Sequence, residues 1–154
     1  MFKYFDRALK AVLALMGFTM IIVGFAQVFW RYVLGHSLTW SEELLRYLFI
    51  WIVLAGAPTG VPSGAHVSFD MLRKIIPDRF KRAYEVLINI LILLGFLFMT
   101  IWGLPYALSN FDHYSPAMGI NFGWVILAVP VGGIIGIIYT LHTIYMQFKV
   151  KEGA

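Results

Sequence analysis

Three ionisable side chains stand at the start of an otherwise apolar segment in the stretch Trp40-Ser41-Glu42-Glu43-Leu44-Leu45-Arg46-Tyr47. Just upstream, Arg31 stands near the end of another apolar segment. Charged side chains are costly in a membrane helix. Four of them at two adjoining helix ends, with formal charges that sum to zero, therefore indicate a specific arrangement.

The composition is that of an integral membrane protein. Of the 154 residues, 60% are hydrophobic and 13% are charged, and the mean hydropathy is +0.80. Soluble domains are about 45–50% apolar and about 25% charged. The absence of cysteine excludes thiol chemistry, disulfides and iron–sulfur ligation. The net charge of +4 reflects membrane topology, so it does not indicate a nucleic-acid partner.

Four segments are apolar enough to cross a bilayer, which takes a helix of about 20 residues. They cover residues 11–34, 40–57, 83–105 and 124–146, and together they form a single membrane domain over residues 1–154. Thr39 is expected to cap the second span, with Glu42 as its capping-box partner. Helix breakers then end this span: Pro58, Gly60, Pro62 and Gly64. The sequence therefore predicts an all-α fold with four transmembrane helices.

The basic residues predict the orientation of the spans. Ten of the 12 Lys and Arg residues flank the spans on one side: Lys3, Arg7, Lys10, Arg73, Lys74, Arg79, Lys81, Arg82, Lys149 and Lys151. Cytoplasmic loops carry the excess of such residues. Both termini are therefore predicted to be cytoplasmic.

A short amphipathic helix is expected over residues 66–76, between the second and third spans. Its apolar residues recur at helical spacing: Phe69, Leu72, Ile75 and Ile76. The segment is too short to span, so it is predicted to lie at the cytoplasmic interface. The alternative is a loop helix packed on the bundle.

Small residues in the fourth span suggest a close helix contact. Gly132 and Gly136 form a small-xxx-small pair, which permits two helices to approach closely. Such pairs also occur by chance in membrane helices. Pro130 is expected to kink the same helix.

The sequence does not indicate an enzyme or a self-contained carrier. Its four histidines, His36, His66, His113 and His142, lie in loops or near span ends, so a haem pair is not expected. No cluster has the spacing of a zinc site or a catalytic triad, so no catalytic residue, metal or cofactor is predicted. A proton-coupled carrier would place an ionisable group deep in a span, and none is found there.

The charged cluster then has two interpretations. In the first, Arg46 pairs with Glu42 and Glu43, which precede it by four and three residues, as partly wet interfacial groups. In the second, the cluster fixes the first two helices together and docks another protein. Trp30, Trp40 and Tyr47 would add an aromatic belt at the outer interface.

A family resemblance is carried by the same residues. The stretch from Phe29 through Arg31-Tyr32-Val33-Leu34-Gly35-His36 and Trp40-Ser41-Glu42-Glu43 to Trp51 resembles the signature of the small membrane subunit of TRAP (tripartite ATP-independent periplasmic) transporters. Gly56-Ala57 and the later Gly64-Ala65-His66-Val67-Ser68-Phe69-Asp70 also fit this pattern. The length and the four spans agree with it.

The resemblance implies a role within a larger assembly in the bacterial inner membrane. Small subunits of this family pair as a heterodimer with a large membrane subunit, which carries the substrate and sodium. A periplasmic protein binds the substrate and docks transiently. The substrates are organic acids such as C4-dicarboxylates or sialic acid. The small subunit is then expected to extend the static scaffold of an elevator-type transporter, in contact with phospholipids.

By analogy, five residues are expected to organise the outer ends of the first two helices and to contact a partner: Arg31, Trp40, Glu42, Glu43 and Arg46. Two other functions stay open. One is a small self-associating carrier or channel, which a charge deep in a span would have favoured. The other is a stabilising subunit of an unrelated membrane complex, against which the signature at residues 29–51 argues.

Overall fold

The computed structural model describes residues 2–63 and 77–149, and most of this part of the chain is helical. The elements are α1 (Phe2–Val33), α2 (Thr39–Gly56), the 3-10 helix η1 (Ala57–Ser63), α4 (Asp78–Ser109), α5 (Phe122–Ile126) and α6 (Ala128–Lys149). Among the described residues, extended pairing is limited to an isolated bridge between Tyr114 and Asn121.

Within the described residues, four helical segments are long and apolar enough to cross a membrane. They are Phe2–Val33, Thr39–Val61, Tyr84–Ser109 and Phe122–Met146. This confirms the predicted all-α fold with four helices of membrane-spanning length. The chain is therefore a multi-pass membrane protein.

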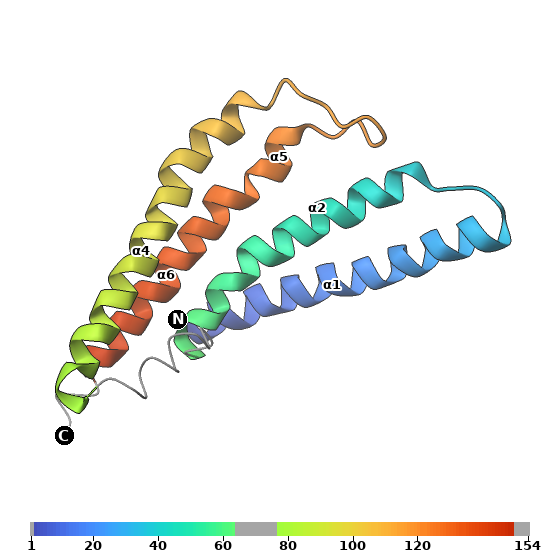
Figure 1. The fold of residues 1–154 in the computed structure, drawn as a ribbon. Coiled ribbons are helices and arrows are strands. Elements are labelled where there is room, and N and C mark those ends of the chain that lie inside the picture. Colours follow the sequence, from blue (N-terminus) through green and yellow to red (C-terminus); the bar gives the residue numbers. More distant parts are fainter. Residues whose placement is uncertain (1, 64–76, 150–154) are drawn as a thin grey trace.

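The helices form two pairs that meet at one end and diverge toward the other (Figure 1). One pair is α1 with α2, and the other is α4 with α6. We call the end where α1 begins and α6 finishes the terminal end. The opposite end, which carries residues 34–38 and 110–121, is called the loop end. The pairs touch chiefly where α2 and η1 pack on α6.

The core is small and lies at this junction of the two pairs. It consists of Ala55, Val61, Ile135 and Tyr139, from α2, η1 and α6. By contrast, α1 contains no buried residue, and its Phe25 is 74% exposed. In a bilayer, lipid or a partner protein covers such apolar surface, so exposure here does not imply instability.

Glycines allow α6 to approach both of its neighbours closely. A Cβ on Gly132 would lie 2.5 Å from the backbone oxygen of Leu54 in α2, and one on Gly136 would overlap the ring of Phe96 in α4. Gly133 likewise faces Phe96 and Thr100. The small-xxx-small pair singled out in the sequence thus has one glycine against α2 and the other against α4.

The fourth span is interrupted at Leu127, the single residue between α5 and α6. Pro130 has no N–H to donate to the carbonyl of Ile126, four residues earlier, and a straight helix would bring its ring against that carbonyl. The interruption is local, because the N–H of Leu127 donates to the carbonyl of Gly123 over 2.9 Å and its own carbonyl accepts the N–H of Val131 over 3.1 Å. The helix therefore continues across Leu127, with a disturbance one turn before the proline.

The prediction for the start of the second span is wrong in detail. The N-cap of α2 is Leu38, without a side-chain cap, and Thr39 already lies inside the helix. The hydroxyl of Ser41 donates to the carbonyl of Leu38 over 2.7 Å instead. At the other end, α2 stops at Gly56, as the helix breakers that begin at Pro58 predict, and the 3-10 helix η1 follows.

The short helix predicted at residues 66–76, with Phe69, Leu72, Ile75 and Ile76, lies outside the described residues. Its existence therefore stays a prediction, as does the side of the membrane on which the termini lie.

Candidate functional site

Glu43 joins α2 to the loop between α4 and α5 at the loop end of the molecule. Its side chain is buried, with 8% exposure. Its carboxylate accepts the backbone N–H of Ala117 over 3.1 Å and that of Met118 over 3.0 Å. Ser115 is a further hydrogen-bond partner of this carboxylate. Hydrogen bonds to a charged acceptor are stronger than neutral ones. We call these four residues the loop latch.

The loop is folded so that its N–H groups can reach Glu43. Ser115 and Ile120 close it: the N–H of Ser115 donates to the carbonyl of Ile120 over 2.8 Å, and the N–H of Ile120 donates to the Ser115 hydroxyl over 3.2 Å. Gly119 has φ +64°, a left-handed conformation that glycine adopts without strain. The turn therefore leaves the N–H groups of Ala117 and Met118 free to bind the carboxylate.

Asn121 connects this loop to the start of α5. Its side-chain oxygen accepts the N–H of Gly123 over 3.0 Å, and its amide donates to the carbonyl of Phe111. It is therefore both the N-cap of α5 and a tie to the end of the loop. The N–H of Phe122 also donates to the carbonyl of His113 over 2.8 Å.

Glu42, unlike Glu43, points toward α1. Its Oε1 accepts the side-chain amide of Gln27 over 3.4 Å, and both side chains are exposed. Arg31 and Arg46 are exposed as well, and among the described residues neither forms an ion pair within 4.0 Å. Arg46 is close enough to Glu43 for a Coulombic interaction only. The pairs of Arg46 with Glu42 and Glu43 expected from their spacing are therefore not formed, because an amide and backbone N–H groups occupy both carboxylates.

The two aromatic residues of the cluster have different environments. Tyr47 is buried, and its ring meets that of Phe122 edge-on, with centroids 6.2 Å apart. Trp40 is 41% exposed. Tyr47 thus adds a contact between α2 and α5, whereas Trp40 faces outward from the structure.

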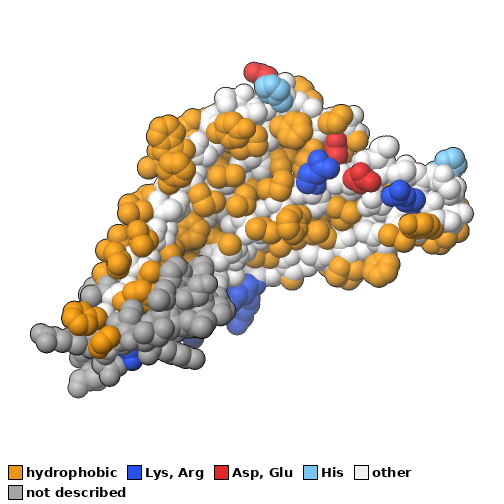
Figure 2. All heavy atoms as spheres, viewed as in Figure 1, with side chains coloured by type: hydrophobic (Ala, Val, Ile, Leu, Met, Phe, Trp, Pro, Cys, Tyr) orange, Lys and Arg blue, Asp and Glu red, His pale blue; other side chains and the backbone are white. Residues whose placement is uncertain are grey.

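Charged side chains gather along one face of the loop-end half of the α1–α2 pair, among apolar side chains (Figure 2). In that half of α1 and α2 the Lys, Arg, Asp and Glu residues are Arg31, Glu42, Glu43 and Arg46. The sequence-predicted cluster is therefore one surface region, with only Glu43 turned into the structure.

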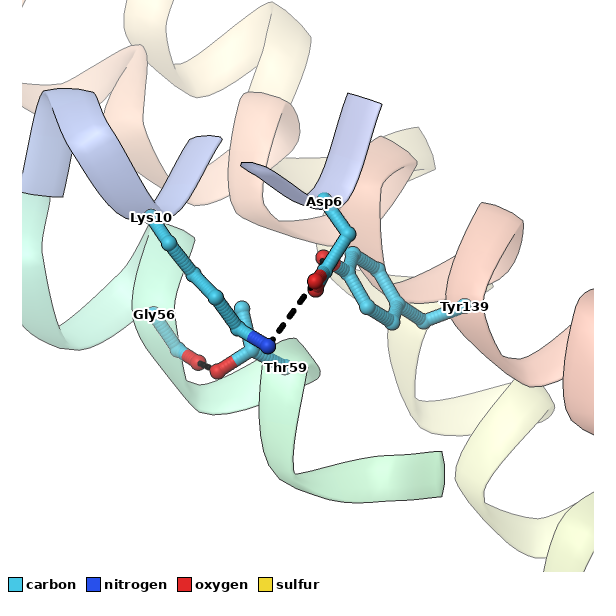
Figure 3. A network of polar contacts seen from close by, with 5 residues as sticks. All are labelled: Asp6, Lys10, Gly56, Thr59 and Tyr139. Atoms are coloured by element: carbon cyan, nitrogen blue, oxygen red, sulfur yellow. Dashed lines mark hydrogen bonds and ion pairs between the residues drawn. The ribbon is translucent and has the colours of Figure 1, made fainter. Parts of the chain in front are cut away.

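A second polar network lies at the terminal end and was not anticipated from the sequence. The hydroxyl of Tyr139 in α6 donates to Oδ1 of Asp6 in α1 over 2.7 Å. Lys10 donates to Oδ2 of the same carboxylate over 2.9 Å (Figure 3). The ring of Phe2 stacks on His142, with centroids 3.6 Å apart and planes 6° from parallel, and meets Tyr139 edge-on at 5.0 Å. We call these five residues the terminal clasp.

The sequence held only a weak signal for this network. Asp6 is the only acidic residue among the basic residues that precede the first span. Tyr139 lies in an apolar segment where a tyrosine is unremarkable. Its almost complete burial, at 1% exposure, is visible only in the structure.

The described residues contain no group of three or more His, Asp or Glu side chains placed to hold a metal ion. The loop latch and the terminal clasp both join elements that are distant in sequence. The loop latch joins α2 to the α4–α5 loop, and the terminal clasp joins α1 to α6.

The chain was compared with known protein families. Residues 20–150 match the family described as "Tripartite ATP-independent periplasmic transporters, DctQ component". The chain belongs to this family. The family match covers the loop latch and most of the residues that form the two helix pairs, and it agrees with the resemblance seen in residues 29–70.

Individual relatives support the assignment to the DctQ family. The chain is 25% identical to the sialic acid TRAP transporter small permease protein SiaQ of Vibrio cholerae over 127 residues, which cover 82% of this chain and 73% of the relative. It is 27% identical to the ectoine TRAP transporter small permease protein TeaB of Halomonas elongata over 157 residues, covering 94% and 81%.

A third relative is much longer. The sialic acid TRAP transporter permease protein SiaT of Haemophilus influenzae is 27% identical over 132 residues, which cover 82% of this chain but 21% of SiaT. The chain is therefore similar to one part of that permease.

Proposed function

We propose that this chain is the non-catalytic small permease subunit of a sodium-coupled TRAP importer, and that it extends the static scaffold of a large elevator-type membrane subunit. The large subunit carries the substrate and sodium. A periplasmic binding protein delivers the substrate and docks transiently. The chain itself uses no cofactor.

The observation that carries this proposal is the scarcity of charge along the helix interiors, where Arg46, seven residues inside α2, is an exposed exception. No Asp, Glu, Lys or Arg occurs in residues 11–30 of α1, 47–56 of α2, 86–109 of α4 or 128–141 of α6, all of which the structure describes. Ion and proton pathways in membrane proteins use ionisable or strongly polar groups at mid-membrane. A scaffold that leaves transport to a partner does not need them.

The relatives support the same proposal. The names of the matching proteins specify sialic acid, ectoine and C4-dicarboxylates, although all are TRAP permease components. Similar small subunits thus occur in transporters for different substrates. We therefore propose that an organic acid is transported and that the partner proteins select it.

The basic residues support an orientation with both termini in the cytoplasm of a bacterial inner membrane. The loop latch then lies on the periplasmic side. In this position, Glu43 holds the loop at residues 110–121 on the face that a periplasmic protein approaches.

The experiment that tests this function is uptake into proteoliposomes. The cognate large subunit is reconstituted alone or together with this chain, and the periplasmic protein, labelled substrate and an inward sodium gradient are supplied. Uptake is expected only when both membrane subunits are present. A sodium ionophore serves as the control for coupling and should abolish this uptake.

Equal uptake by the large subunit alone would contradict the proposed requirement for this chain. Uptake that continues after the ionophore has collapsed the sodium gradient would contradict sodium coupling but leave the scaffold role intact.

A further inference from the structure

Arg46 is left without a close partner by the way the structure uses the neighbouring acids. Glu43 binds the backbone of the loop, and Glu42 accepts from Gln27. The guanidinium of Arg46 is exposed, and among the described residues it makes no ion pair within 4.0 Å. Within the described residues the Arg46 guanidinium therefore has a Coulombic interaction with Glu43 but keeps its hydrogen-bond donors for another partner.

The position of Arg46 makes a membrane-embedded partner the best fit. It lies seven residues inside α2, which places it roughly 10 Å along the helix at 1.5 Å per residue. An unpaired charge at such depth is costly, so charged groups in membrane segments are usually paired. A partner within the bilayer reaches this depth, whereas a soluble protein docks on the outer surface.

The surface around Arg46 also has the composition of a protein contact. Phe49 and Val53 follow at three and seven residues, so they share its face of α2. They are 57% and 44% exposed, respectively. Arginine and phenylalanine are both enriched in protein interfaces relative to the rest of the surface.

We propose that Arg46 binds a carboxylate of the large membrane subunit, with Phe49 and Val53 packed beside this contact. The inference rests on the proposed function, since it assumes that the large subunit is the partner. Arginine suits such a contact because its planar guanidinium binds a carboxylate through two parallel hydrogen bonds. Arg46, Phe49 and Val53 then attach α2 to the large subunit, while Glu43 holds the loop at residues 110–121 of this chain.

The test is recovery of the intact complex. The chain carries an affinity tag and is coexpressed with the cognate large subunit, and the large subunit recovered per tagged chain is measured in mild detergent. Arg46→Gln is expected to reduce recovery at least tenfold, and Arg46→Lys is expected to reduce it less. Arg7→Gln, which removes an exposed arginine at the terminal end, is the matched control and should leave recovery unchanged.

A second variant tests the same face without removing a charge. Phe49→Ala truncates an exposed side chain, so it should not disturb the fold of the chain, but it should lower recovery severalfold. Membrane levels of each variant expressed alone report whether the chain accumulates normally.

Wild-type recovery by both Arg46→Gln and Phe49→Ala would overturn the inference. The phospholipid phosphorus content of the purified complex is also measured. It distinguishes a protein contact of Arg46 from binding to a lipid phosphate. Normal recovery of the large subunit with a loss of bound phospholipid in Arg46→Gln would assign Arg46 to a lipid phosphate and overturn the proposed contact. Failure of the wild-type chain to recover any large subunit would instead contradict the proposed function itself.

Discussion

The hydroxyl of Tyr139 donates to Oδ1 of Asp6 over 2.7 Å and so joins residues that lie 133 positions apart in the chain. It holds the start of α1 against α6 at the end where the two helix pairs meet. Although α1 contains no buried residue, it is held at this end by the terminal clasp, by Phe5, whose ring lies 6.1 Å from that of Tyr139, and by Leu9 and Leu13, which pack against the core.

Tyr139→Phe should therefore loosen the terminal end while retaining the ring contacts with Phe2. The change removes the hydroxyl that binds Asp6 and leaves Lys10 as the partner of that carboxylate. Loss of one hydrogen bond to a charged group is expected to lower the apparent Tm of the detergent-solubilised chain by about 2–5 °C. Thermal unfolding followed by circular dichroism measures this change.

The matched control for this variant is Tyr145→Phe, on the same helix. Tyr145 is 61% exposed and outside the clasp. A similar change in Tm for both variants would show that the Asp6 contact contributes nothing specific to stability.

Glu43→Gln should release the loop at residues 110–121. A glutamine of similar size offers one acceptor oxygen, whereas the carboxylate uses both oxygens to bind Ala117 and Met118. We expect the amide hydrogens of these two residues to exchange about tenfold faster or more, because a charge-assisted acceptor is lost. Hydrogen exchange with mass spectrometry measures the rates.

Glu42→Gln is the control for this effect. It removes the neighbouring charge, which contacts Gln27 and not the loop. Unchanged hydrogen-exchange protection of the loop in Glu43→Gln would contradict the loop latch. An equal loss of protection in Glu42→Gln would also contradict it.

Gly132→Ala should destabilise the packing of α6 on α2. The new Cβ would lie 2.5 Å from the backbone oxygen of Leu54, which cannot rotate away as a side chain would. The added methyl group forces α6 away from α2, and this is expected to lower the free energy of unfolding by about 1–3 kcal/mol. Unfolding of the purified chain in mixed micelles by a denaturing detergent measures the change.

Gly24→Ala offers a comparison within the same chain, because a Cβ at Gly24 in α1 meets nothing within 4 Å. It should be neutral or slightly stabilising, since alanine favours the helix more than glycine does. Equal stability of the two alanine variants would contradict a close contact at Gly132.

The helix predicted at residues 66–76 also has a direct test. If its apolar face lies on the membrane surface, Phe69→Asp combined with Ile75→Asp should place two charges there and reduce uptake severalfold in proteoliposomes. The acidic pair Asp70→Asn and Asp78→Asn is a control that changes charge away from the apolar face. Unchanged uptake with normal membrane insertion would contradict the prediction.

The four long helices could be predicted because uninterrupted apolar segments leave few alternatives in a bilayer. The interruption of the fourth span could be predicted only in part. Pro130 predicts a disturbance about one turn earlier, but the structure is needed to place it at Leu127.

The partners of the charged residues could not be predicted. Spacing on one helix favours pairs of Glu42 and Glu43 with Arg46. Glu43 instead binds two backbone N–H groups more than 70 positions away, and spacing within one helix carries no information on such a contact. The contact between Asp6 and Tyr139 was missed for the same reason.

The divergence of the two helix pairs has a consequence for the surrounding lipid. In α1, Lys10 and Arg31 are separated by 21 residues, or about 32 Å of helix, close to a hydrocarbon thickness of about 30 Å. This helix thus matches the bilayer when it stands nearly upright. The α4–α6 pair diverges from it (Figure 1), so the two pairs cannot both stand upright and at least one of them crosses obliquely. The protein therefore has a wedge-shaped profile that is wider in one leaflet than in the other. Lipids on its two sides contact helices that are tilted differently.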